Sequence, residues 1–143
     1  MKKSILILAI TLFSFSVIAD ECEDNFNKGV YQNAKGNRFV QTASRRFESA
    51  KEESSSSNPD NEVVCESLQE ARMAAWLGGK QFIKAVQSFR KAYMSCYDEN
   101  EESAKRNRRL NEKNLESQRE FIGDMCDVLS SQCDVPCPDF FNI

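Results

Sequence analysis

The chain contains six cysteines, and this count constrains its fold more than any other feature of the sequence. An even number of cysteines in a short exported chain favours three disulfides. Zinc sites use close ligand pairs such as C-x2-C, thioredoxin-type redox sites use C-x2-C as well, and the sequence contains no such pair. The tightest spacing, Cys133-x3-Cys137, lies across Pro136. We therefore expect structural disulfides, no metal and no cofactor. The six cysteines are Cys22, Cys65, Cys96, Cys126, Cys133 and Cys137.

The first 19 residues have the pattern of a signal peptide. A positively charged start precedes an apolar run over 5–18, and Ala19 ends a motif that permits cleavage. The run is shorter than the roughly 20 apolar residues of a membrane span. We expect residues 1–19 to be removed, with no stable membrane insertion afterwards. The remaining single domain, residues 20–143, is then periplasmic or secreted, where disulfides form.

The charge of the chain argues against several functions. Nineteen Lys and Arg oppose 22 Asp and Glu, and loss of two lysines with the signal peptide would take the formal charge from −3 to −5. An acidic chain is poorly suited to nucleic acid, whose binding depends on neutralising phosphates. The chain also lacks histidine, the commonest general base and metal ligand near neutral pH. With no recognisable catalytic residues, we expect a protein that is not an enzyme.

The pattern of apolar residues indicates an all-α fold. Helical periodicity recurs along the mature chain, and no long segment alternates as a half-buried strand does. Gly36 begins a plausible break, and Gly78-Gly79 is expected to kink or break a second helix. A flexible serine-rich loop is expected over 54–61, and a non-helical tail with two prolines over 133–143. We predict a small disulfide-stapled bundle of four to five helices around a long antiparallel central hairpin.

The central hairpin predicts one disulfide directly. We expect a helix over 62–97 to run antiparallel to a helix over 101–132, with the turn near Glu99. Residues whose numbers add up to about 198 then face each other. Cys65 and Cys133 satisfy this condition, so they should lie side by side at the open end of the hairpin.

The same register assigns the other four cysteines. Cys96 would face Glu102, so its partner must come from outside the hairpin. Cys22 is the natural candidate. The remaining pair is Cys126 with Cys137. A true helix break at the double glycine would invalidate this register.

A basic cluster over 105–109 is the first candidate for partner binding, through Arg106 and Arg109. Its basic side chains have acidic neighbours three or four residues away, so a salt-bridged surface is the simplest interpretation. The alternative is a patch for an acidic protein surface or a phosphate group. Leu110 and Leu115 are expected to be the main apolar contacts of this half of the helix. The acidic neighbours are Glu101, Glu102, Glu112 and Glu116.

Phe140 and Phe141 are the second candidate for partner binding. Two adjacent aromatic side chains cannot easily both face inward in an extended segment. A disulfide at Cys137 would hold this tail against the body of the protein. The two rings therefore either close the core, or one of them is an exposed anchor for a partner.

These features together predict an exported binding protein. The most concrete hypothesis is a periplasmic inhibitor or immunity protein that blocks a cell-wall hydrolase or a toxin by protein–protein contact. A compact acidic domain suits the blocking of a basic cleft, with acidic residues that steer the encounter. The first alternative is a structural component of the envelope or surface that self-associates through its helices. The second is an enzyme with an unrecognised carboxylate site.

Overall fold

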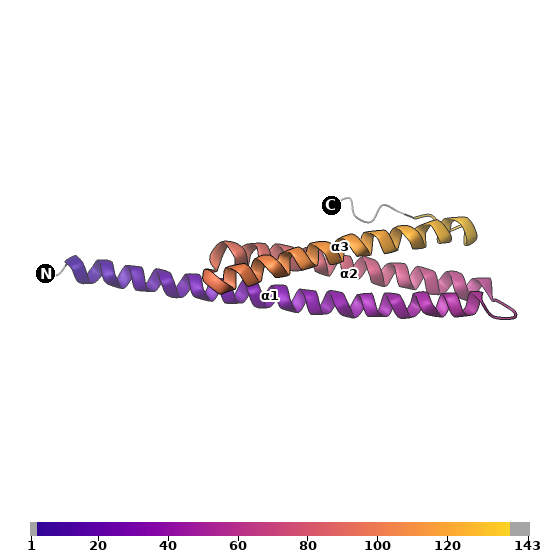
Figure 1. Cartoon of the computed structure of the whole chain (residues 1–143), viewed down its shortest axis with the longest axis horizontal. Helices are drawn as coiled ribbons and strands as arrows, with labels where there is room; N and C mark the ends of the chain where they lie inside the picture. Colours follow the sequence, from indigo (N-terminus) through magenta and orange to yellow (C-terminus); the bar gives the residue numbers. More distant parts are fainter. Residues whose placement is uncertain (1–2, 138–143) are drawn as a thin grey trace.

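The computed structural model describes the backbone of residues 3–137 and the side chains of residues 20–137. This part of the chain forms three helices and no strand: α1 (Lys3–Ser54), α2 (Asn61–Ser95) and α3 (Asp98–Gln132) (Figure 1). The all-helical prediction is confirmed. The prediction of four to five helices is wrong, because the structure has three longer ones.

The helices continue through the glycines at which the sequence predicted a break or kink. Gly36 lies within α1 and Gly78-Gly79 within α2, and all three glycines are buried. A Cβ atom at Gly78 would lie only 3.3 Å from the carbonyl oxygen of Gly36. The glycines therefore mark the place where two continuous helices approach closely. Packing of the two helices outweighs the roughly 1 kcal/mol by which each glycine disfavours a helix relative to alanine.

α1 and α2 form an antiparallel hairpin in which glycines of α1 pack against phenylalanine rings of α2. Gly29 packs against the ring of Phe89, and Gly36 against the ring of Phe82. This alternation lets two aromatic rings enter the interface without separating the helix axes. One row of buried and half-buried positions of α1 repeats at spacings of four and three, the repeat of a coiled coil. They are Cys22, Phe26, Gly29, Asn33, Gly36, Val40, Ala43, Phe47 and Ala50.

α3 packs along a second side of α2, so that α2 is central and contacts both other helices. α1 and α3 touch at few positions, among them an edge-to-face contact between Phe47 and Phe121 with ring centroids 5.3 Å apart. The apolar packing between α2 and α3 is concentrated in the second half of α3, where Met125 and Leu129 are fully buried. The antiparallel α2–α3 hairpin is the one that the sequence predicted.

Near the middle of α3, two polar side chains instead face inward. Asn111 is fully buried and Gln118 nearly so, and each has a side-chain oxygen without a hydrogen-bond partner. The amide of Asn111 donates to the backbone oxygen of Asn107 at 2.8 Å. Buried amides of this kind lower stability but disfavour other registers of two packed helices.

Three disulfides fasten the helices together. Cys22 pairs with Cys96 and fastens α1 to the end of α2. The bond from Cys65 to Cys133 joins the start of α2 to the end of α3. These are the pairs that the hairpin register predicts, and the third, Cys126 with Cys137, ties the chain after α3 back onto that helix. Three intramolecular disulfides fit an oxidising extracellular compartment. Among the described residues, no helix is long and apolar enough to cross a membrane.

The two short connections have different structures. Residues 55–60 join α1 to α2, within the predicted serine-rich loop, and Asp60 caps α2 by accepting hydrogen bonds from the backbone of Glu62 and Val63. Cys96 and Tyr97 join α2 to α3. Residues 133–137 follow α3 without helix. The side chains of the predicted signal peptide, residues 1–19, lie outside the described part, and its cleavage stays a prediction.

Candidate partner-binding face

Four basic side chains line the outer face of α3 in its first half. They are Lys105, Arg106, Arg109 and Lys113, which we call the basic stripe. Their spacings of three and four residues place them on neighbouring turns of one side of the helix. The acidic first turn of α3, with Asp98, Glu99 and Glu101, precedes the stripe and interacts favourably with the helix dipole.

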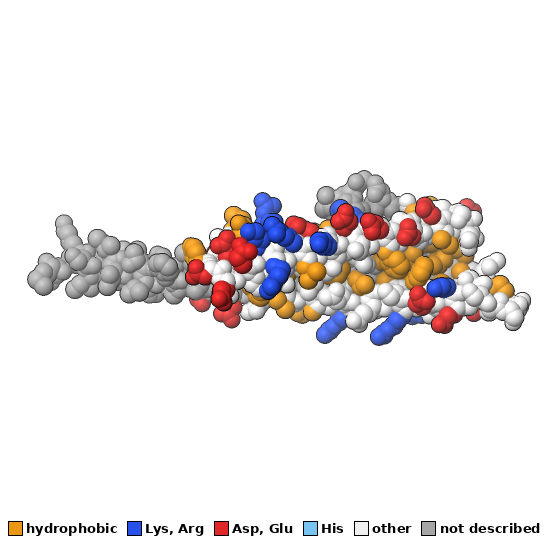
Figure 2. All heavy atoms as spheres, in the orientation of Figure 1, with side chains coloured by type: hydrophobic (Ala, Val, Ile, Leu, Met, Phe, Trp, Pro, Cys, Tyr) orange, Lys and Arg blue, Asp and Glu red, His pale blue; other side chains and the backbone are white. Residues whose placement is uncertain are grey.

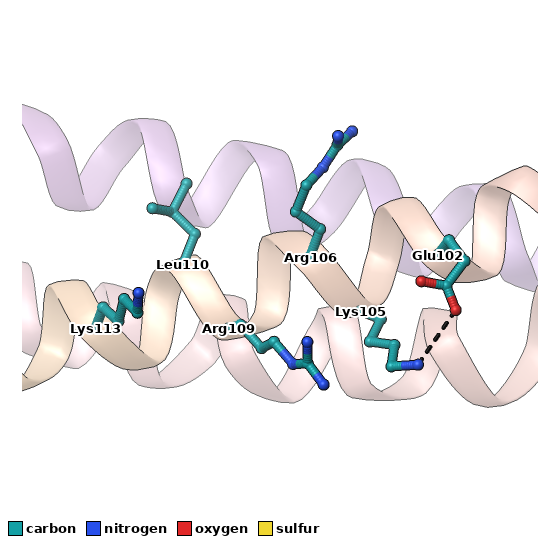
Figure 3. Close-up of a pocket in the computed structure, with 6 residues that line it drawn as sticks. All are labelled: Glu102, Lys105, Arg106, Arg109, Leu110 and Lys113. Atoms are coloured by element: carbon teal, nitrogen blue, oxygen red, sulfur yellow. Dashed lines mark hydrogen bonds and ion pairs between the residues drawn. The ribbon is translucent and has the colours of Figure 1, made fainter.

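The basic stripe surrounds a shallow surface hollow of about 460 Å³. Figure 3 shows that α3 supplies every side chain drawn around it, with Arg106 and Leu110 projecting toward one edge and Arg109 toward the other. Leu110 is 49% exposed, which corrects the expectation that it is a main apolar contact of the helix. Its neighbour Asn111 occupies the inward position, while Leu115 is half-buried as a contact residue should be.

Intramolecular ion pairs satisfy only part of the basic cluster. Lys105 pairs with Glu102 at 3.2 Å, and Arg108 with Glu112 at 3.4 Å. Arg108 also lies with its guanidinium carbon 6.0 Å from the ring centre of Tyr93 on α2. The salt-bridged surface expected from the sequence is therefore present at these two residues.

The other three members of the basic stripe are different. Arg106, Arg109 and Lys113 are exposed and make no ion pair with any described residue. A guanidinium group offers a planar fork of donors that matches a carboxylate in two parallel hydrogen bonds. Exposed side chains without a partner lose no existing contact when they bind one. The stripe is thus able to bind an acidic surface at little internal cost.

The outer face of α3 changes sign along its length. Figure 2 shows basic side chains gathered over the first half of α3 and acidic ones along the second half. The acidic ones on the outer face are exposed and form no ion pair within the described chain. We call them the acidic stripe: Glu116, Glu120, Asp124 and Asp127.

The structure brings together two of the four residues predicted to bind a partner. Arg106 and Arg109 lie on the same hollow. Phe140 and Phe141 lie outside the described residues, so their predicted role stays a prediction. Lys113 as a member of this face and the exposure of Leu110 were not predicted from the sequence. Their distances of seven and four residues from Arg106 are the signal that would have placed them on the same face.

Within the described part of the chain, no group of three acidic or cysteine side chains is placed to hold a metal ion. Comparison with known proteins found no family model that matches this chain, no similar curated protein and no similar solved structure.

Proposed function

We propose that this protein is an exported binding protein that blocks an envelope hydrolase or a toxin by protein–protein contact. The observation that carries the proposal is the basic stripe, in which Arg106, Arg109 and Lys113 are exposed and form no ion pair with the residues that the structure describes. Arginine is among the residues that contribute most to protein–protein binding. The exposed Leu110 beside these cations adds an apolar contact at the centre of the same face.

The rigidity of α3 supports this role. The disulfide between Cys65 and Cys133 fixes the end of α3 to α2, and the two-residue connection at Tyr97 fixes its start. A face held at both ends loses little conformational freedom when a partner binds. Binding energy is then available for the contact itself instead of being consumed by ordering the helix.

The charge of the basic stripe fits the chemistry of a cell-wall glycosidase. Such an enzyme carries two carboxyl groups across its catalytic cleft, and one of them must be ionised for the reaction. Arg106 and Arg109, one helical turn apart, present two guanidinium groups toward such an acidic cleft. Contact with the cleft would exclude the substrate and neutralise the catalytic carboxylate. In this proposal the basic stripe makes the blocking contact with an acidic cleft, which differs from the expectation from the sequence that an acidic domain blocks a basic cleft.

Capture of the partner tests the proposal. The exported, oxidised protein carries an affinity tag and is incubated with an extract of its own envelope, and the bound proteins are identified by mass spectrometry. We expect a hydrolase or toxin in stoichiometric amount, with lower activity in the complex. The double variant R106A/R109A should lose the partner, whereas R45A, which removes an exposed arginine from α1, should retain it.

Two results would contradict the proposal. One is capture of structural envelope proteins alone, which would favour the assembly alternative. The other is capture of a hydrolase by R106A/R109A at the level of the unchanged protein, which would place the contact elsewhere on the surface.

A further inference from the structure

The outer face of α3 is complementary to itself. Its basic stripe precedes its acidic stripe along one side of one helix, and every member except the half-buried Lys105 is exposed. We propose that two copies of this protein pair through this face, with their α3 helices antiparallel. The inference goes beyond the proposed function and does not depend on any second protein. A parallel arrangement would set like charges against each other, so the charge order itself selects the antiparallel one.

One register pairs three of the four side chains of the basic stripe with three of the four of the acidic stripe, whereas Lys105 faces Val128 and Glu116 faces Ser117. When the twofold axis passes between Glu116 and Ser117, Arg109 of one copy faces Asp124 of the other. The same register sets Lys113 against Glu120 and Arg106 against Asp127. The symmetry of the pair repeats each contact, because every residue of one copy meets the same partner in the other. The paired positions follow spacings of three and four residues, as the contact line of two packed helices requires.

The register also accounts for the one large apolar side chain on this face. Leu110, which is 49% exposed, falls opposite Gly123 of the other copy. A Cβ atom at Gly123 would have no atom within 4 Å, so the surface there is open. A leucine over a bare glycine allows two helices to approach closely at both ends of the interface. The same glycine costs α3 helix propensity and has no packing role inside the single chain.

The size of the interface indicates a weak dimer. The stretch from Arg106 to Asp127 is about 32 Å long at the rise of an α-helix. One exposed helix face of this length gives an interface at the small end of the specific range, where reversible complexes are found. Because the contacts are mostly charge pairs, added salt should weaken the dimer strongly.

The dimer and the proposed partner would use the same cations. An acidic partner that binds Arg106 and Arg109 must displace the second copy, so dimer and complex exclude each other. The dimer and the binding of a partner can nevertheless be refuted separately. Dimerisation is measured on the purified protein alone, and capture of a partner is measured in an extract.

Analytical ultracentrifugation of the exported, oxidised protein tests the dimer. We expect a concentration-dependent dimer at about 50 mM NaCl whose dissociation constant rises by about tenfold or more at about 500 mM. Charge reversal supplies the specific test. R109E and D124R should each weaken the dimer by about tenfold or more, because each sets like charges together. The double variant R109E/D124R, and an equimolar mixture of the two single variants, should recover it.

The design separates specific pairing from net charge. D124R makes the acidic chain less negative, so a dimer limited by general repulsion would become tighter in this variant. R45E on the exposed face of α1 makes the chain more negative by the same amount as R109E, and it should leave the dimer unchanged. A monomer at all concentrations in low salt would overturn the proposal. So would a D124R dimer of undiminished strength, or failure of the double variant to recover the dimer.

Discussion

Substitution of alanine for glycine should have opposite effects at two positions within the helices of this protein. In the middle of a helix, alanine is favoured over glycine by about 1 kcal/mol. At Gly123 a Cβ atom meets nothing within 4 Å, so G123A should gain most of this amount, roughly 0.5–1 kcal/mol. At Gly36 the new Cβ atom would lie 2.6 Å from Cε1 of Phe82. Carbon atoms pack at about 3.5–4 Å, so one of the two must move by about 1 Å.

Phe82 has no room to move, because it is 1% exposed and lies between two helices. Overpacking of this kind costs about 1–3 kcal/mol, which exceeds the gain in helix propensity. We expect G36A to lose about 1–2 kcal/mol of unfolding free energy. For a domain of this size, 1 kcal/mol corresponds to about 4 °C in melting temperature. Thermal unfolding by circular dichroism under oxidising conditions should therefore separate G36A and G123A by about 6–12 °C.

A repeat of the substitution at Gly29, which packs against Phe89 in the same way, provides a matched test of the mechanism. G29A should resemble G36A and not G123A. If G36A and G29A raise the melting temperature as G123A does, the close packing of α1 on α2 is refuted. The contacts of Gly29 and Gly36 would then not hold the two helices of the hairpin in close packing.

Three further perturbations test the fastening of the helices. Removal of the disulfide between Cys22 and Cys96, which lie 74 residues apart, should lower the unfolding free energy by about 3–4 kcal/mol in guanidinium titration; a loss below about 1 kcal/mol would contradict its role. D60A removes the cap of α2 and should cost about 1 kcal/mol in the same assay, while N58A in the loop should cost almost nothing. N111L replaces a fully buried amide whose oxygen has no partner, and should raise stability by up to about 1 kcal/mol; a clear loss would show that the amide is better satisfied than its contacts indicate.

The helical class and the α2–α3 hairpin could be read from the sequence because both depend on local patterns. Apolar residues repeat with helical spacing, and the polar turn near Glu99 lies close to the connection at Tyr97. The cysteine register followed from the same regularity, since antiparallel helices with a short connection have a fixed rise and a fixed facing order. Cys65 therefore lies beside Cys133 in the structure as the arithmetic requires.

The number of helices could not be read in this way. Gly36 and Gly78 carry the local signal of a helix break, and only their contacts across the hairpin show that they serve close packing instead. The prediction that Leu110 is a main apolar contact was wrong for a related reason. Asn111 before the middle of α3 and Gln118 just after it occupy inward positions, so an apolar pattern alone places the wrong side of the helix against α2.

For the candidate binding face, too, the sequence determined one part and the tertiary structure another. The sequence by itself determined that basic residues cluster over 105–109 and that acidic residues follow them, and it predicted the cysteine pairs only through an assumed hairpin register. The tertiary structure decided which of these charges form ion pairs. Lys105 and Arg108 pair with acidic side chains of α3, whereas Arg106 and Arg109 form no ion pair among residues 20–137. That choice depends on which side of α3 packs against α2, and this orientation is set by the side-chain volumes of both helices together, which no local pattern of α3 alone contains.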